Sequence, residues 1–224
     1  MKVTLLAHTP EPEKVCAAAA RSCYSADGAS DLLDAKDPEK FLAGVVKMGH
    51  ESVIEHAVFT FSVEGVSRSL THQLVRHRIA SFSQQSQRYV SLEEPGYVVP
   101  PTVAADPGKE RMFREAMDKA WETYNALAEA GIPAEDARYV LPNACFTNIT
   151  ITMNARELRH FFSLRCCNRA QWEIREMADR MLEICREVCP AIFADAGAAC
   201  VRGPCPEGKK SCGHPRRRSR AVGP

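Results

Sequence analysis

Hydrophobic and polar residues recur along the chain with two periods, and each period predicts a kind of element. Strict alternation in AVFTFSV, residues 57 to 63, predicts a strand with a buried face. KVTLLAH, residues 2 to 8, and FTNITITMN, residues 146 to 154, predict two more strands. The chain should therefore contain a sheet whose strands are far apart in the sequence.

Apolar residues three or four apart predict helices between these strands. Such spacing covers residues 13 to 24, 38 to 48, 112 to 127 and 171 to 189. Strands and long helices do not alternate as regular βαβ units, so the fold class is α+β. We expect one compact domain over residues 1 to 203.

A helix is expected from Val66 into RHRIASFSQQSQRY, residues 76 to 89, because Val66 and Leu74 belong to one apolar stripe. Gln73 and Arg76 would then share a face. The stretch holds three arginines, a histidine, three serines and three glutamines, with no acidic residue. Guanidiniums suit phosphate oxygens, and amides and hydroxyls suit sugar and base edges, so a nucleotide or phosphate site is predicted. A solvated basic helix end is the alternative.

Polar residues also gather in GHESVIEH, residues 49 to 56. Its two histidines are six apart, which excludes the H-E-x-x-H zinc motif. His50, Ser52 and Glu55 are candidates for cofactor contact, with an ordinary polar helix end as the alternative.

A helix after the third strand brings further arginines. Asn154 and Glu157 have the N-x-x-E form of a capping box, which predicts a helix start. Arg159, Arg165 and Arg169 follow along this segment. Each is either a surface residue or a contact in a pocket, and spacing alone does not rank them.

Composition and missing motifs narrow the function classes. The 224 residues include 29 Lys and Arg against 28 Asp and Glu, so a net charge of +1 gives no global attraction to nucleic acid or membrane. No apolar run has the length of a transmembrane helix and no secretory leader is recognisable, so a cytoplasmic protein is expected. Neither G-x-G-x-x-G nor G-x-x-x-x-G-K-[ST] occurs, so a nucleotide would bind by another route.

Past Pro190 the chain becomes rich in Cys, Gly, Pro and Arg, and we expect a mobile tail over residues 204 to 224. The spacing of its cysteines lacks C-x-x-C pairs, which leaves a zinc site, disulfides or free thiols open. The residues concerned are Cys189, Cys200, Cys205, Cys212 and His214, with a basic end formed by Arg216, Arg217, Arg218 and Arg220.

Arg76-His77-Arg78, followed by seven residues and Ser86, is similar to the motif of flavin-dependent thymidylate synthases. GHES-x-x-EH upstream and ARYVLP, MNARELRHFFSLR and AQWEIR downstream keep the family's order, so the resemblance covers residues 3 to 204. It implies an α+β domain with a helix-flanked, largely antiparallel sheet, and a homotetramer with active sites between subunits. It also implies methylation of dUMP to dTMP, with 5,10-methylenetetrahydrofolate as carbon donor, FAD as redox cofactor, NADPH as reductant and no protein nucleophile.

The resemblance assigns roles residue by residue. Arg165 matches the arginine that faces the pyrimidine and polarises it, and is the leading catalytic candidate. The positions matching dUMP contacts are Gln73, Arg76, Gln85, Ser86, Gln87, Arg88, Arg138 and Arg165. The positions matching FAD contacts are His50, Ser52, Glu55, Arg76, His77, Arg78, Ile79, Ser83, Gln84, Asn154 and His160.

Four positions depart from the family pattern. Ser83 and Gln84 stand where Asn and Glu are familiar, His160 where Asn is, and Arg169 where His is. Two other function classes stay open. A nucleic-acid-binding protein would show salt-dependent affinity and no flavin, and a nucleotide-sensing module would bind dUMP without turnover.

Overall fold

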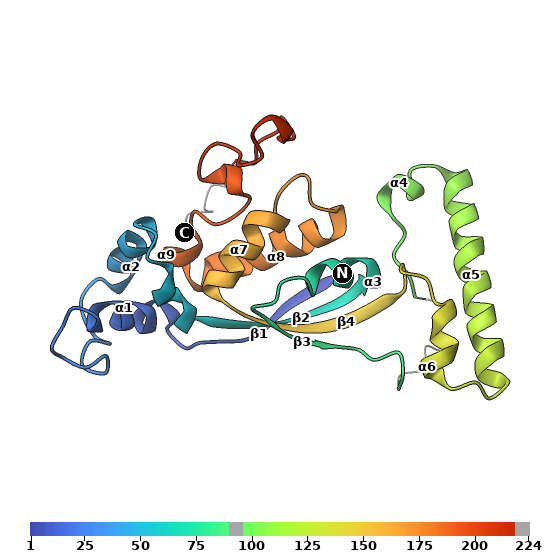
Figure 1. Ribbon diagram of the computed structural model, residues 1–224, viewed down its shortest axis with the longest axis horizontal. Coiled ribbons are helices and arrows are strands. Elements are labelled where there is room, and N and C mark those ends of the chain that lie inside the picture. Colours follow the sequence, from blue (N-terminus) through green and yellow to red (C-terminus); the bar gives the residue numbers. More distant parts are fainter. Residues whose placement is uncertain (90–95, 218–224) are drawn as a thin grey trace. The chain divides into compact units, whose positions relative to one another are not determined.

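The computed structural model describes residues 1–89 and 96–217. The strands form a four-stranded antiparallel sheet in the order β1-β2-β4-β3, and Figure 1 labels these strands and the main helices. The α+β class predicted from the sequence is confirmed. The elements are β1 (Lys2–His8), α1 (Pro12–Ser22), α2 (Pro38–Lys47), η1 (Glu51–His56), β2 (Val58–Ser67), α3 (Arg68–Leu74), β3 (Ser81–Gln84), α4 (Pro101–Ala104), α5 (Pro107–Glu129), α6 (Ala134–Ala137), η2 (Arg138–Val140), β4 (Phe146–Asn154), α7 (Ala155–Arg165), α8 (Trp172–Val188), α9 (Pro190–Phe193), η3 (Ala199–Val201) and η4 (Gly208–Lys210).

The chain forms two compact units. Unit 1 comprises Met1–Lys2, Val63–Arg76 and the described part of Phe82–Thr150, and unit 2 comprises Val3–Ser62, His77–Ser81 and the described part of Ile151–Pro224. The predicted boundary between residues 203 and 204 stays a prediction.

Alternation in the strands translates into burial as expected. Phe59, Phe61 and Val63 of β2 are fully buried, as is Ile151 of β4. In unit 2, the hydroxyls of Thr60 and Thr152 are 3.0 Å apart, so β2 and β4 pair in a defined register. All three predicted strands are present, as β1, β2 and β4.

The core of unit 2 is an aromatic cluster joined to the helices. Phe59 meets Phe193 edge to face at 5.6 Å between ring centroids, and Phe162 meets Phe193 at 6.0 Å. Phe161 of α7 continues the cluster, 5.7 Å from Phe162. Helices α7 and α8 pack together, as do α1 and α2 (Figure 1). Helix α7 is thereby fixed along its apolar side, which matters for the charged residues that it carries.

The helix predicted from Val66 into residues 76 to 78 is wrong at both ends. Strand β2 continues to Ser67, whose hydroxyl accepts a hydrogen bond from Leu70 N–H at 3.0 Å and starts α3. Helix α3 ends at Leu74, so Gln73 and Arg76 do not share a helix face. The Arg-His-Arg motif consequently lies on irregular backbone.

Two helical stripes are less buried than the sequence predicts. In α5, Trp121 and Tyr124 are buried, but Met112 is 67% exposed. Met48 follows α2 and is also 67% exposed. Among the described residues, no helix combines the length and the apolar character needed to span a membrane.

Candidate active site

A buried histidine connects two charged residues of α7. His77 is 5% exposed and Glu157 is 7% exposed. His77 Nδ1 lies 3.1 Å from Glu157 Oε1, and Arg165 Nε donates to His77 Nε2 at 3.0 Å. The His77 ring also packs edge-on against Phe161, with ring centroids 4.9 Å apart. One residue of the predicted flavin motif is thus fixed between Glu157 and the leading catalytic candidate.

The helix start places these residues. Asn154 caps α7, since its Oδ1 accepts from Glu157 N–H at 2.9 Å, as the capping-box pattern predicts. The Glu157 carboxylate contacts His77. Sequence reasoning saw Glu157 only as a capping partner. The missed signal was a carboxylate four residues before Phe161, on the apolar side of the helix.

Burial keeps His77 neutral. Desolvation lowers the pKa of His77 below its usual value, the hydrogen bond and charge of Glu157 oppose this, and the charges of Arg165 and His160 add to the lowering. Burial also lowers the pKa of Arg165. A neutral imidazole beside a guanidinium is therefore the state of this site near neutral pH.

The other flavin candidates of unit 2 lie on its surface. Arg78 and His160 are exposed, and Ile79 is 69% exposed. The remaining exposed candidates, all from η1 and the residue before it, are His50, Ser52 and Glu55. A guanidinium and a hydroxyl can donate hydrogen bonds to flavin phosphates, and an exposed apolar side chain can pack against the flavin ring. This set of side chains therefore fits a flavin.

Two of these candidates already have protein partners. Glu55 forms an exposed ion pair with Arg156 at 2.6 Å. The Asn154 side chain serves as the helix cap, so of its two predicted roles the cap is the one present in this structure. A flavin contact from either residue would compete with these bonds.

In unit 1 the segment from Ser83 to Gln87 is partly tied to the core. The Gln84 amide nitrogen donates to the hydroxyls of Thr71 at 3.0 Å and Thr147 at 3.2 Å, both buried. Glutamine replaces a familiar glutamate here, and its NH₂ group supplies the two donors that this contact uses. Gln84, which departs from the family pattern, is therefore hydrogen-bonded to buried residues of the core.

Gln85 and Gln87 differ in their surroundings. Gln85 N–H donates to Asn148 C=O at 2.9 Å, and the Asn148 amide donates back to Gln85 Oε1 at 3.3 Å. Gln87 Nε2 is buried and has no hydrogen-bond partner within the described part of the chain. A buried amide donor without a partner is uncommon in proteins and fits an acceptor on a bound ligand.

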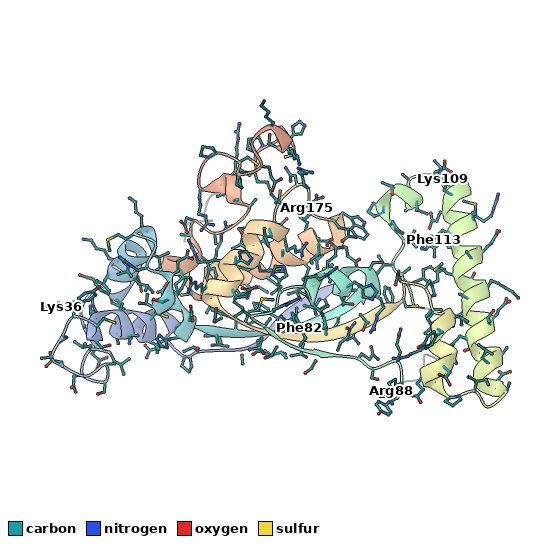
Figure 2. The ribbon with its side chains drawn as sticks, viewed as in Figure 1. Lys36, Phe82, Arg88, Lys109, Phe113 and Arg175 are labelled. Atoms are coloured by element: carbon teal, nitrogen blue, oxygen red, sulfur yellow. The ribbon has the colours of Figure 1, made fainter. Side chains whose placement is uncertain are left out.

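Arginines of unit 1 gather around one glutamate. Arg88 points toward α6 (Figure 2) and contacts Glu135 Oε2 through Nε at 2.9 Å and Nη2 at 2.8 Å. Arg138 Nε donates to the backbone carbonyl of Glu135 at 3.1 Å. Burial and the charge of Arg138 lower the pKa of Arg68, a residue missed in the sequence. Half-buried guanidiniums close to one another suit an anion.

The three candidate arginines that the sequence placed along this segment have separate roles. Arg159 is 3% exposed and pairs with Glu51 at 3.2 Å and Asp195 at 2.7 Å, so it is a structural residue. Arg169 is exposed and contacts the tail at Glu207, 3.6 Å away. Among them, Arg165 is the one joined to the Arg-His-Arg motif.

The tail contributes a cavity of about 410 Å³ lined by cysteines of unit 2. Cys200, Cys205, Cys212 and His214 line it together with Cys167, whereas Cys189 is fully buried and is not part of the lining. All ten cysteines are free thiols, and within residues 1–89 and 96–217 no three His, Cys, Asp or Glu side chains are arranged for a metal ion. Arg218 and Arg220 lie outside the described residues.

The sequence profile of the thymidylate synthase complementing protein family matches residues 4–191. The chain belongs to this family. A relative named flavin-dependent thymidylate synthase from Geobacter sulfurreducens is 55% identical over 218 residues, covering 95% of this chain and 94% of the relative. Proteins of the same name from Clostridium tetani and Pyrococcus furiosus are 51% and 43% identical over 232 and 219 residues, covering 95% and 92% of this chain and 93% and 90% of the relatives. The resemblance to flavin-dependent thymidylate synthases is confirmed over most of the chain.

Proposed function

We propose that this protein is a flavin-dependent thymidylate synthase that converts dUMP to dTMP. The observation that carries the proposal is the contact between Arg165 and His77, because it joins the leading catalytic candidate to the Arg-His-Arg motif. Relatives that match over most of the chain are named flavin-dependent thymidylate synthase. The overall reaction consumes dUMP, 5,10-methylenetetrahydrofolate, NADPH and one proton, and yields dTMP, tetrahydrofolate and NADP⁺.

Arginines of unit 1 would hold the nucleotide. Arg138 and Arg68 lie close enough for one charge to affect the pKa of the other, which favours a dianionic phosphate between them. Arg88 would join once its contact with Glu135 is exchanged for phosphate. The buried Gln87 amide would donate to a carbonyl or sugar oxygen of the same ligand.

Arg165 would stabilise the reacting pyrimidine. Carbon 5 of uracil becomes nucleophilic as negative charge develops on the ring, and a guanidinium held in a fixed orientation stabilises that charge. The bond to His77 engages one of the five N–H donors of the guanidinium. The exposed flavin candidates of unit 2 would hold FAD, which would supply the hydride chemistry once reduced by NADPH.

The buried cysteines support a reaction without a protein nucleophile. Burial raises the pKa of Cys145 to about 11 and that of Cys16 to about 12. It also raises the pKa of Cys166, Cys185 and Cys189. A thiol with a raised pKa is a poor nucleophile near neutral pH, so these five side chains are unsuited to attack a pyrimidine.

We further propose a homotetramer with active sites between subunits, as the family resemblance implies. Sedimentation of the purified protein tests the assembly. A monomer that forms dTMP at full rate would remove this part of the proposal and leave the activity standing.

The activity is tested by incubating the protein with dUMP, methylenetetrahydrofolate and NADPH, with and without FAD, and quantifying dTMP by chromatography. We expect dTMP only in the complete mixture. A folded protein that binds dUMP and FAD without forming dTMP would be a nucleotide-sensing module. Salt-dependent binding of RNA or DNA without flavin binding would favour the nucleic-acid class.

A further inference from the structure

We propose that Glu157 is a positioning residue that orients Arg165 through His77, by holding the His77 proton on Nδ1. No resemblance assigned Glu157 a role at the site. Its importance for catalysis rests on the proposed function, since it requires Arg165 to act on the substrate. The state of the histidine itself can be tested separately.

The hydrogen bond between Arg165 and His77 has a fixed donor and acceptor. A guanidinium has donors only and stays protonated in proteins, so Arg165 Nε–H must donate to His77 Nε2 at 3.0 Å. Nε2 therefore carries a lone pair. The single proton of a neutral imidazole is then on Nδ1, which faces Glu157 Oε1 at 3.1 Å.

Loss of the Glu157 carboxylate would change the tautomer of His77. A buried Nδ1–H without an acceptor is unfavourable, so the proton would move toward Nε2 in part of the molecules. There it would oppose Arg165 Nε–H, donor against donor. Glu157 thus stabilises the one tautomer of His77 that accepts a hydrogen bond from Arg165. The buried aspartate of a Ser-His-Asp triad holds its histidine in one tautomer in the same way.

The orientation of the His77 ring is also fixed. Phe161 packs edge-on against His77, with an angle of 76° between the two ring planes. Glu157 and Phe161 belong to α7, and His77 is held by its contacts with both. The side chains of Glu157 and His77 are 7% and 4% exposed, so water does not readily replace either partner. With the tautomer and the ring plane both fixed, Arg165 Nε has one direction for its bond.

The charged groups facing His77 predict a pH effect. These groups are Glu157, Arg165 and His160, and of the three only Glu157 raises the pKa of His77. Replacing Glu157 by glutamine should therefore move the titration of His77 to lower pH. A role of Glu157 in helix packing alone would not move it.

The experiment uses full-length protein with ¹⁵N-labelled histidine, and assigns His77 by the signal lost in His77→Asn. Three variants are compared with the unmodified protein: Glu157→Leu removes the acceptor at similar volume, Glu157→Gln keeps a carbonyl acceptor, and Glu187→Gln is an exposed control on α8. We expect an Nδ1–H tautomer in the unmodified protein, Glu157→Gln and Glu187→Gln, and a mixture in Glu157→Leu.

Steady-state kinetics give the second readout. Misplacing a catalytic group by about 1 Å can cost about 100-fold in rate, so kcat for dTMP should fall by about that factor in Glu157→Leu and by roughly tenfold or less in Glu157→Gln. The KM for dUMP should change less than kcat. Thermal unfolding of each variant identifies loss of folded protein.

Two results would overturn the proposal. One is an Nε2–H tautomer in the unmodified protein. The other is an Nδ1–H tautomer and unchanged kcat in Glu157→Leu. If no protein forms dTMP, the proposed function fails, while the NMR spectra still decide the tautomer. If Glu157→Leu does not fold, the lowered titration of His77 in Glu157→Gln decides.

Discussion

Two regions of helix α7, around Arg159 and around Arg165, differ in the residues that the guanidinium contacts. At Arg159, two carboxylates from Glu51 and Asp195 meet one guanidinium and join α7 to η1 and to the residues after α9. At Arg165, the partner of Nε is the neutral ring of His77. The first arrangement compensates a buried charge, and the second fixes the Nε atom of the guanidinium against an imidazole ring. The residue that the guanidinium contacts, more than the arginine itself, separates a structural from a catalytic candidate.

The most severe test of this comparison is Arg165→Met. Removing a donor that stabilises developing charge typically lowers the rate by about 100- to 1000-fold, or about 3 to 4 kcal/mol in the barrier, and we expect such a fall in kcat for dTMP. Arg165→Lys should recover only part of it, because an ammonium lacks the planar guanidinium. Initial rates with saturating dUMP and FAD measure both. An unchanged kcat in Arg165→Met would remove this residue from the chemistry.

Arg159→Met should have the opposite profile. Breaking a buried ion pair costs about 3 to 5 kcal/mol, and we expect the lower end because the side chains of Glu51 and Asp195 are 31% and 34% exposed and can be hydrated. Urea unfolding followed by tryptophan fluorescence measures the loss of stability. Activity per folded molecule should stay close to that of the unmodified protein. A stable variant with a collapsed kcat would break the comparison.

The sequence predicted the elements of these regions better than the roles of their arginines. Alternation located β2 and β4, and Asn154 located the start of α7, because both signals are local. The boundary between β2 and α3 was wrong because Val66 continues the apolar pattern of either element. Gly65 adopts a φ of 67° inside the strand, and Ser67 supplies the cap where the helix begins.

Arg159 and Arg165 had equal standing in the sequence because their partners are distant. Glu51 is 108 residues from Arg159, and His77 is 88 residues from Arg165. Spacing along one helix carries no information about such contacts. The family motif ranked Arg165 first but did not indicate Glu157, whose role depends on the burial of His77.

The N-terminal end of α7 allows a smaller test, because Asn154 was assigned both a cap and a flavin contact. Asn154→Ala should lower the free energy of unfolding by about 1 kcal/mol, and Asn154→Ser should keep most of the stability because serine also caps. Chemical denaturation measures both variants, and flavin fluorescence titration measures FAD affinity. If Asn154→Ser keeps stability and weakens FAD binding, the residue exchanges its cap for a ligand contact.

Arg88 of unit 1 is a third case, with an acidic partner like Arg159 but 48% exposed in its side chain. An exposed pair stabilises by a few tenths of a kcal/mol, so the phosphate of dUMP has to displace Glu135 at a modest cost. Glu135→Gln should therefore tighten dUMP binding roughly twofold, or about 0.5 kcal/mol, in calorimetric titrations. The gain should shrink at high salt, because salt screens the pair that the variant removes.

Glu122→Gln, which breaks the exposed pair with Lys119 on α5, is the matched control and should leave dUMP affinity unchanged. Equal gains in both variants would mean that net charge, and not the release of Arg88, sets the affinity.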